Sequence, residues 1–400
     1  MATLLFMLNL LRKSLAIEID NFLCHFDPES ASKNARSLTT SAFIQNRQKI
    51  DPELFRHLSA VTVENFYTLE NDNIQLFKGF RILAVDGSCI TLPFTAELKK
   101  HYGVSRNQSK TEVVQARLSV LYDVMNRLSL DARLSPLNAG ERDLAMEHAH
   151  QWKNNDLIIY DRGYPGYGFI LEHLKGKVDY LIRVKTTESN VVRDFVASGK
   201  KSITTAIFPK QSQSFKDKEY DQDSALKVRL VRVDLPDGEI EVLITSLLDS
   251  QKYPAKMFRQ LYFFRWGIET FYDELKNKLK VEYFSGYSIQ SIQQDLHCAL
   301  FISNIQSVIV NDLQEELQQQ CQTRVYQYKI NANLSYGFLK NRILELLFKE
   351  ASLEKVFKEL QDLFLKNTVP VRNNRTNPRN KDKYRTRVKP KVTKNQKDAI

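Results

Sequence analysis

Two aspartates each end an apolar run, and both could therefore be held rigidly at the edge of a sheet. Asp86 follows the run ILAV, and Asp161 follows the run LIIY. Both runs are typical of buried strands, and carboxylates at the ends of neighbouring strands can converge on a metal ion. Each aspartate also has a plainer interpretation, since Asp-Gly is a common turn and Asp161-Arg162 can form a local ion pair.

A third acid lies on a predicted long amphipathic helix over residues 254–280. Tyr262, Arg265, Glu269 and Lys276 fall on one narrow face of this helix at ~100° per residue. Their neighbours, such as Phe263, Trp266 and Phe271, are apolar around much of the helix. A buried acid with two bases needs partners. An intramolecular salt-bridge network would meet that need, and so would a metal ion and a phosphate.

The spacing Tyr262-x2-Arg265-x3-Glu269-x6-Lys276 resembles the signature of the IS4 family of bacterial insertion-sequence transposases. This family includes cut-and-paste enzymes that form DNA hairpins. The resemblance covers roughly residues 40–310. Two further segments carry it: VDGS and YDRGY resemble the sequences around the family's first and second catalytic acids, and the helix after YFSG, with Asp295 and Asn304, resembles its C-terminal part.

The resemblance implies a fold and a chemistry. The fold is α/β, an RNase H-like mixed sheet flanked by helices, with an antiparallel β insertion between the second and third acids. Asp86, Asp161 and Glu269 would be the catalytic acids and would hold two Mg²⁺ ions, with Mn²⁺ as a possible substitute. Hard cations of this kind prefer carboxylate oxygens.

The implied partner is double-stranded DNA, both the transposon ends and the target. Tyr262, Arg265 and Lys276 would contact DNA phosphates, Arg265 as a two-pronged donor and Lys276 as a point charge. Because transposition brings two ends together, a homodimer in the DNA complex is expected. The implied location is the bacterial cytoplasm, in association with the nucleoid.

Hydrophobic periodicity predicts how the elements around these residues are organised. Residues 1–80 are predicted to be a helical region that binds DNA or forms a solvated bundle, and 81–186 the first part of the catalytic core. The segment 187–249 contains alternating strands around a PDG turn, which indicates an inserted β subdomain. Residues 250–366 are predicted to be helical, and the basic tail 367–400 to be disordered.

The positive charge is concentrated in the tail and does not by itself indicate DNA binding by the folded part. The whole chain carries +11, of which residues 370–400 contribute +9 and residues 1–369 only +2. The four cysteines form no CxxC pair, so neither a zinc site nor a disulfide framework is indicated. The apolar N-terminus predicts a buried helix, not a signal peptide, and no membrane span is expected.

Aromatic residues of the insertion bear on the hairpin route. In hairpin-forming relatives a tryptophan in the insertion holds a flipped base, but the two tryptophans here, Trp152 and Trp266, lie outside 187–249. Phe208, Phe215 or Tyr220 could stack a base instead, although each is also consistent with a core or loop aromatic.

Several other polar residues have plainer interpretations than a role in the site. Asp123 could be a fourth acid near the site, and Asp273 could pair with Lys276. His148, His150 and His297 are expected to be surface or packing residues.

Two alternatives to a transposase keep the same fold. One is an inactive or repurposed transposase that only binds DNA. The other is a structure-specific nuclease that cuts without joining. One scaffold can host all three functions, so fold analogy does not choose among them.

Overall fold

A long mixed sheet runs through the molecule and carries both predicted aspartates on neighbouring strands. The computed structural model describes residues 2–9, 11–26, 39–68, 73–106, 111–209, 224–236, 238–322, 324–348 and 353–371. Within them the sheet has nine strands in the order β2-β3-β1-β5-β6-β9-β8-β7, with β4 paired to β3. Its strands are β1 (Arg81–Thr91), β2 (Val104–Arg106), β3 (Glu112–Asp123), β4 (Leu128–Pro136), β5 (Asp156–Tyr160), β6 (Asp179–Val184), β7 (Ser202–Ile207), β8 (Leu226–Asp234) and β9 (Ile240–Thr245).

The half of the sheet formed by β4, β3, β1, β5 and β6 has the RNase H-like arrangement. Strands β1, β3 and β4 are antiparallel neighbours, while β5 is parallel to β1 and β6 is parallel to β5. The tight turn after β3 contains Arg127 with a positive φ of 60°, and the parallel pairs need helical crossovers. These crossovers contain α7 (Glu141–Glu147), η1 (His148–Gln151) and α8 (Tyr167–Lys175). The predicted fold class is confirmed.

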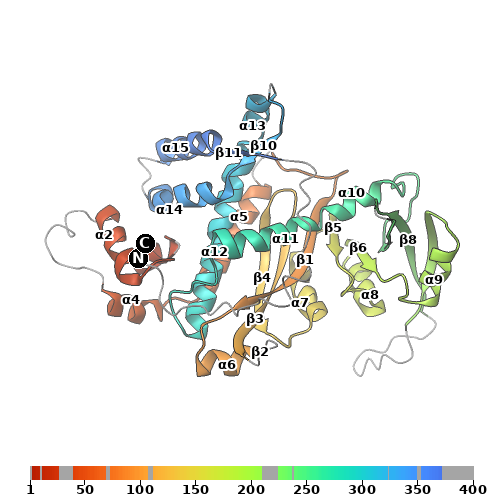
Figure 1. Ribbon diagram of the computed structural model, residues 1–400, viewed down its shortest axis with the longest axis horizontal. Coiled ribbons are helices and arrows are strands. Elements are labelled where there is room, and N and C mark those ends of the chain that lie inside the picture. Colours follow the sequence, from red (N-terminus) through yellow and green to blue (C-terminus); the bar gives the residue numbers. More distant parts are fainter. Residues whose placement is uncertain are drawn as a thin grey trace.

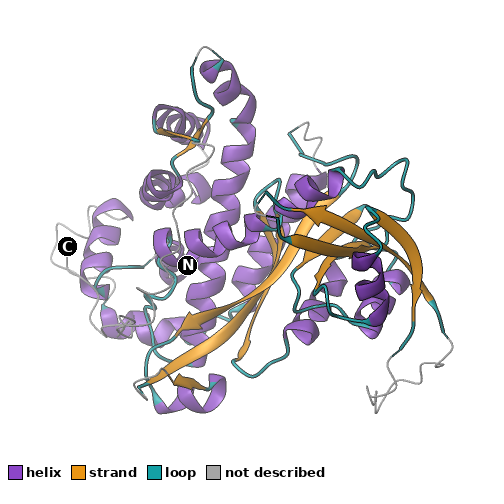
Figure 2. Cartoon of the chain, turned by 45° about the vertical axis from the view of Figure 1, so that its right-hand side comes forward, coloured by secondary structure: helices purple, strands orange, loops and turns teal. Residues whose placement is uncertain are grey.

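The insertion between the second and third acids is antiparallel, as predicted, but its strands continue the central sheet. Strand β9 pairs antiparallel with β6, and β8 and β7 follow outwards, with α9 (Asn190–Ala197) against β8. This pairing covers the backbone groups that β6 would otherwise present as an open edge. Figure 2 shows the strands of the insertion curving away from the core as one continuous sheet.

Four helices of the N-terminal region pack on the C-terminal helices. They are α1 (Ala2–Leu8), α2 (Leu15–Phe26), α4 (Thr40–Arg47) and α5 (Glu53–Thr68). The prediction of a buried N-terminal helix is confirmed, because Leu5, Phe6, Met7 and Leu8 of α1 are buried. The short helix α6 (Ala96–Tyr102) lies apart from this group and covers β3.

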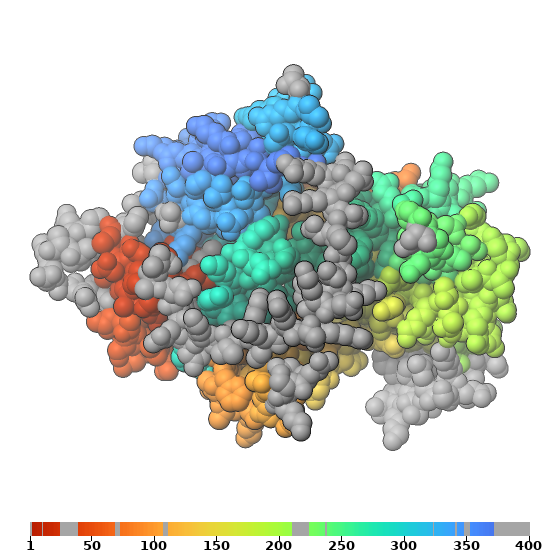
Figure 3. Space-filling model, in the orientation of Figure 1, coloured from red at the N-terminus to blue at the C-terminus, as the bar shows by residue number. Residues whose placement is uncertain are grey.

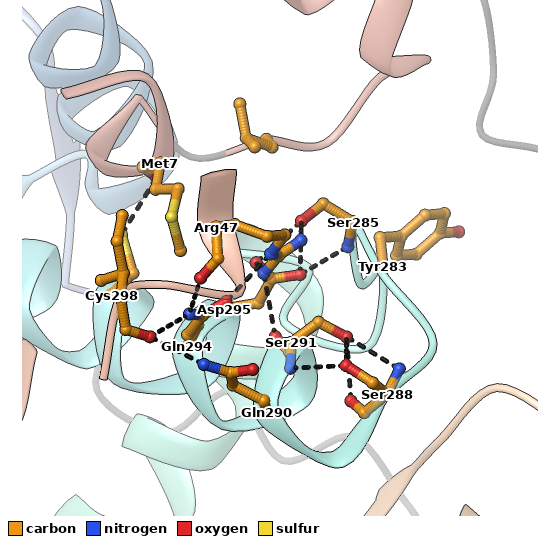
Figure 4. Close-up of polar contacts among 12 residues, drawn as sticks. Met7, Arg47, Tyr283, Ser285, Ser288, Gln290, Ser291, Gln294, Asp295 and Cys298 are labelled. Carbon is orange, nitrogen blue, oxygen red and sulfur yellow. Dashed lines mark hydrogen bonds and ion pairs between the residues drawn. The ribbon is translucent and has the colours of Figure 1, made fainter. Parts of the chain in front are cut away.

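Two arginines of this N-terminal region are used inside the protein. Arg47 is buried and bonds to Asp295 at 2.9 Å, to Gln294 at 2.9 Å and to Ser285 at 2.7 Å, a network visible in Figure 4. Arg56 pairs with Glu53 at 2.7 Å and with Asp131 at 3.3 Å. These contacts favour the helical-bundle interpretation for both arginines.

The long helix predicted over 254–280 is divided into three segments. They are α10 (Met257–Phe263), α11 (Trp266–Asp273) and the π-helical turn η2 (Glu274–Lys278). The second predicted helix bends by 50° between α12 (Ile289–Asp312) and α13 (Gln314–Cys321). No single helix among the described residues could cross a membrane by length and composition, although α12 and α13 together pass that test.

The last described residues form two more helices and a small sheet. Helices α14 (Ala332–Phe348) and α15 (Leu353–Lys366) pack together, and β10 (Tyr328–Ile330) pairs with β11 (Thr368–Pro370). The first residues of the predicted disordered tail therefore form a strand, and the rest of that tail lies outside the described residues.

Apolar cores hold the helices on opposite faces of the sheet, and two of them lie beside β1 and β3. One contains Ala84 and Val120 with Ile268 of α11 and Leu296 of α12. The other contains Leu83 and Leu121 with residues of α8. Helix α11 crosses the sheet in Figure 1, and Figure 3 places the N-terminal helices and the insertion at opposite ends of the molecule.

Candidate active site

Asp86 lies within β1 on the face that α11 covers. Its backbone pairs with Val120 of β3, and the hydroxyl of Tyr272 donates a 2.7 Å hydrogen bond to its carbonyl oxygen. Burial raises the pKa of the Asp86 carboxyl to about 6, with a smaller upward contribution from the negative charges of Asp161 and Glu269. Both acids are therefore close enough to act electrostatically on Asp86.

Asp161 directly follows β5, beside Asp86. The strands that carry them are parallel neighbours, with Ala84 aligned to Ile159. Oδ1 of Asp161 accepts a 3.1 Å hydrogen bond from the Tyr262 hydroxyl and lies 2.9 Å from Nη2 of Arg183. Burial on its own would raise the pKa of Asp161, but the backbone N–H of Arg162 and the charges of Arg183 and Arg265 lower it overall.

Glu269 reaches the same place from α11, and a buried arginine lies between the acids. Nη2 of Arg265 donates to Oε1 of Glu269 at 2.7 Å, and Nη1 lies 3.9 Å from Oδ2 of Asp86. The charge of Asp161 also acts on Arg265 and raises its pKa. The guanidinium of Arg265 thus lies between Asp86 and Glu269, and the charge of Asp161 acts on it.

Close packing of α11 against the sheet brings Glu269 to this position. A Cβ atom on Gly267 would lie 3.0 Å from Cβ of Val124, so a larger residue would push the helix away. Tyr272 and Phe271 fix the same helix from below, Tyr272 through its bond to Asp86 and Phe271 by stacking on Tyr122 with ring centroids 4.4 Å apart.

The three phosphate-contact candidates also face the site. Tyr262 bonds to Asp161, and Arg265 bonds to Glu269 and lies 5.0 Å from the centroid of the Trp266 ring. Lys276, on the π-helical turn, donates to Oγ of Ser88 at 2.7 Å and to the carbonyl oxygen of Cys89 at 2.8 Å. All four polar residues predicted to share one face of this helix therefore contact β1, Asp161 or one another.

The donor set suits a hard divalent cation in charge and type, although the side chains do not converge on one point as they stand. Among the described residues, no three His, Cys, Asp or Glu side chains lie close enough to hold a metal ion together. Arg265 and Arg183 supply the positive charge between the acids. Within the described ranges, the Nε atoms of both arginines are buried and have no hydrogen-bond partner, so each guanidinium retains a donor for a ligand.

Comparison with known proteins decides the family. Residues 78–305 match the family model described as "Transposase DDE domain". The chain belongs to the DDE transposase family. The transposase InsG of insertion sequence element IS4 from Escherichia coli (strain K12) is 22% identical over 249 residues. That match covers 62% of this chain and 55% of InsG, so the chain spans about half the length of this relative.

A solved structure is similar at a lower level. A piggyBac transposase synaptic complex with hairpin DNA, determined by cryo-electron microscopy, has 11% sequence identity and a TM-score of 0.40. The alignment covers 96% of this chain and 80% of that chain. The resemblance to the IS4 family noted from the signature residues is confirmed by the family match and by InsG.

Sequence reasoning missed two charged residues near the predicted acids. Arg183 of β6 binds Asp161, and its position could have been inferred, because β6 is the strand after β5. Glu141 of α7 pairs with Arg117. Its carboxylate oxygens lie 3.5 and 3.4 Å from where Cβ atoms on Gly87 and Gly163 would be. Nothing in the helical pattern around Glu141 indicated that contact.

The suggestion of Asp123 as a fourth acid near the site is wrong. Asp123 is fully buried, and its carboxylate accepts hydrogen bonds from the Tyr67 hydroxyl at 2.5 Å and the Asn126 side chain at 2.8 Å. In the sheet it aligns with Leu83, three residues before Asp86. These local bonds close the turn between β3 and β4, and burial raises the pKa of Asp123.

The remaining polar candidates have structural roles. Asp273 accepts a 2.7 Å hydrogen bond from Asn277, while Lys276 points to Ser88. His148 is buried between Ser119 and Asp131, at 3.0 and 2.8 Å. Two further side chains agree with expectation: His150 is half exposed, and His297 is buried beside Gln293. Asn304, for which no contact was predicted, bonds to Ser129 of β4.

Of the insertion aromatics, Phe208 is described and lies on the surface. It is 56% exposed just after β7 and lines a cavity of about 500 Å³ with Tyr167 and Arg142. Phe215 and Tyr220 lie outside the described residues. Trp266, by contrast, has its ring 5.0 Å from the Arg265 guanidinium and is 45% exposed.

Proposed function

We propose that this protein is the transposase of an insertion sequence, which cleaves DNA at terminal inverted repeats and joins the freed 3′ ends to target DNA. The observation that carries the proposal is the position of Asp86 and Glu269 on either side of Arg265, with Asp161 directly after the strand that neighbours the strand of Asp86 in an RNase H-like sheet. Membership of the DDE transposase family supports it. InsG is named as a transposase for an insertion sequence.

The three acids would hold two divalent cations, Mg²⁺ or Mn²⁺, through carboxylate oxygens alone. Such cations supply activation of a water molecule and neutralisation of the leaving 3′ oxygen. The protein's own contribution is positioning. Asp86 is held within a strand and Asp161 next to one, and Glu269 lies on a helix that Gly267 allows to approach closely. Rigid supports of this kind help to keep catalytic side chains within about 0.5 Å of the productive geometry.

Before DNA binds, the three negative carboxylates need a compensating positive charge, and the guanidinium of Arg265 supplies it. Three carboxylates in a half-buried site repel each other, and the buried guanidinium compensates part of that repulsion. When a phosphodiester enters, Arg265 would have a second role as its donor, because its Nε atom has no hydrogen-bond partner in the part of the chain that the structure describes. Tyr262 and Lys276 would contact phosphates of the same DNA strand. To do so, Tyr262 would release its hydrogen bond to Asp161, and Lys276 its hydrogen bond to Ser88 of β1.

The functional domains follow from this assignment. Residues 81–186 and 250–366 form the catalytic core, 187–249 the insertion, and 1–80 the N-terminal region that assists DNA binding. The basic tail would attract phosphates without sequence preference. Two ends must be cut in one complex, so we infer a homodimer on DNA. A chromosomal substrate in a bacterium would keep the enzyme at the nucleoid.

The direct test uses a plasmid carrying the inverted repeats that flank this gene. The protein is incubated with it in Mg²⁺, Mn²⁺ or EDTA, and nicked, excised, hairpin-ended and joined DNA are resolved on gels. Metal-dependent cleavage followed by strand transfer supports the transposase. Cleavage without joining indicates a nuclease, and binding without cleavage a repurposed protein. Either of the last two results overturns the proposal.

A further inference from the structure

Strands β5, β6 and β9 bring three charged residues together near one end of the sheet. Tyr160 of β5 pairs with Ile182 of β6, so Asp161 and Arg183 are the next residues along these parallel strands. Arg183 pairs with Leu243 of β9, and Glu241 lies two residues away on the same face of that strand. Neighbouring strands are ~4.8 Å apart, which a guanidinium can bridge on both sides.

Arg183 makes this bridge, using a different nitrogen for each acid. Nη2 lies 2.9 Å from Oδ1 of Asp161, and Nη1 lies 2.6 Å from Oε1 of Glu241. The Asp161, Arg183 and Glu241 side chains are 30%, 25% and 17% exposed, so solvent screens these pairs only partly. A series of two ion pairs, Asp161–Arg183 and Arg183–Glu241, therefore connects the second predicted acid with the insertion.

The division of Arg183 between two acids limits its hold on Asp161. Guanidinium groups pair most strongly with a carboxylate when two nitrogens bind it in parallel. Here Glu241 occupies Nη1, and the Tyr262 hydroxyl also binds Oδ1 of Asp161, at 3.1 Å. Without the charge of Glu241, the guanidinium would be free to turn both terminal nitrogens towards Asp161 and compete with a cation there.

We propose that Glu241 is a positioning residue that keeps Asp161 available to a divalent cation by holding Arg183 back. The inference rests on the proposed function, since it assumes that Asp161 is a metal ligand. It also gives the insertion a role in the catalytic core besides any contact with DNA, because β9 carries Glu241. Outer contacts of this kind to a metal ligand typically change metal affinity by roughly 10–100-fold when removed.

The test measures Mn²⁺ binding to the full chain without DNA, by titration calorimetry, alongside thermal unfolding. Glu241→Gln keeps the size of the side chain and removes its charge, and we expect the dissociation constant for Mn²⁺ to rise about 10-fold. The matched control is Asp234→Asn. Asp234 is a carboxylate of the same insertion that pairs with Lys201 and Arg232 and with none of the three residues above. This control should bind Mn²⁺ as the wild type does.

A double-mutant cycle separates positioning from simple packing. If Glu241 acts through Arg183, then Glu241→Gln has no further effect on Mn²⁺ affinity in an Arg183→Ala background. Equal effects in both backgrounds would overturn the proposal. The proposal would also be overturned if the Glu241→Gln protein bound Mn²⁺ with the affinity of the wild type, whether or not its unfolding temperature fell. If the wild type binds no Mn²⁺ even with cleaved DNA ends present, the proposed function fails and this inference fails with it.

Discussion

Nη2 of Arg265 lies 2.7 Å from Oε1 of Glu269, one helical turn further along the chain. The same guanidinium approaches Asp86, and it is 4% exposed. A charge buried this deeply is costly unless it is compensated. The contact therefore ties the third acid to the first before any cation or DNA is bound, and it explains why the signature places a base four residues before its acid.

Replacing any of the three acids should abolish cleavage and spare DNA binding. Asp86→Ala, Asp161→Ala and Glu269→Ala each remove a carboxylate that the proposed cations require. The measurements are plasmid nicking in Mg²⁺ and gel-shift affinity for the inverted repeat. Normal nicking by any one variant would remove that residue from the set of ligands. Asp273→Ala, on the same helix segment but bonded to Asn277, is the matched control and should cleave normally.

Arg265→Ala should weaken the complex with DNA ends by roughly 10-fold, equivalent to ~1.4 kcal/mol, and change metal binding less. The variant loses a donor that would face a phosphate, and charge-assisted hydrogen bonds contribute about 1.5–3 kcal/mol. Arg265→Lys should recover only part of the affinity, because a lysine ammonium cannot bind as a fork. Unchanged gel-shift affinity in Arg265→Ala would contradict the assignment.

The stability of the metal-free protein should depend on the charge of Asp86. Its pKa in the folded protein is about 6, above the ordinary value of 3.8. A raised pKa means that this group stabilises the fold fully below about pH 4 and loses that contribution as pH rises through 6. The loss is at most about 3 kcal/mol.

Asp86→Asn should therefore unfold at higher denaturant than the wild type at pH 8 in EDTA, and the difference should vanish at pH 4. Urea unfolding at several pH values measures this. Equal stability of the two proteins at pH 8 would show that the burial of Asp86 carries no such cost.

Adding Mg²⁺ should stabilise the wild type and not the Asp86→Asn variant. A ligand that binds only the folded state raises stability by RT ln(1 + [L]/Kd), which is ~2.7 kcal/mol at 100 times Kd. Thermal unfolding in EDTA and in increasing Mg²⁺ gives the shift. An equal shift in both proteins would indicate cation binding elsewhere on the molecule.

Removal of residues 371–400 should reduce the salt dependence of DNA binding. Residues 370–400 carry a net +9, and each phosphate that is neutralised contributes about −0.9 to the slope of log K against log salt. Gel shifts between 50 and 200 mM salt would measure this slope. Over that range, proteins with many phosphate contacts lose affinity by roughly 10³–10⁵-fold. A full-length variant with the tail lysines and arginines changed to glutamine is the control for length. A slope that survives both changes would mean that the tail does not contact DNA.

The sequence alone predicted the three candidate acids and determined the fold class of this protein. Asp86 and Asp161 ended apolar runs, and Glu269 fell on the same face as Tyr262, Arg265 and Lys276 of an otherwise apolar helix. These are local patterns with periods of two or 3.6 residues, and local patterns are what a single chain displays directly. The strands of the insertion were likewise visible as alternation, and the structure has them as β8 and β9.

Only the tertiary structure decided which groups meet. That Arg265 lies between the acids, that Arg183 links Asp161 to Glu241, and that Glu141 contacts two glycines all depend on how strands and helices pack. Such contacts join residues up to about two hundred positions apart, so no local period records them. The break of the long helix into α10, α11 and η2 has the same origin, because packing against the sheet outweighs helical propensity.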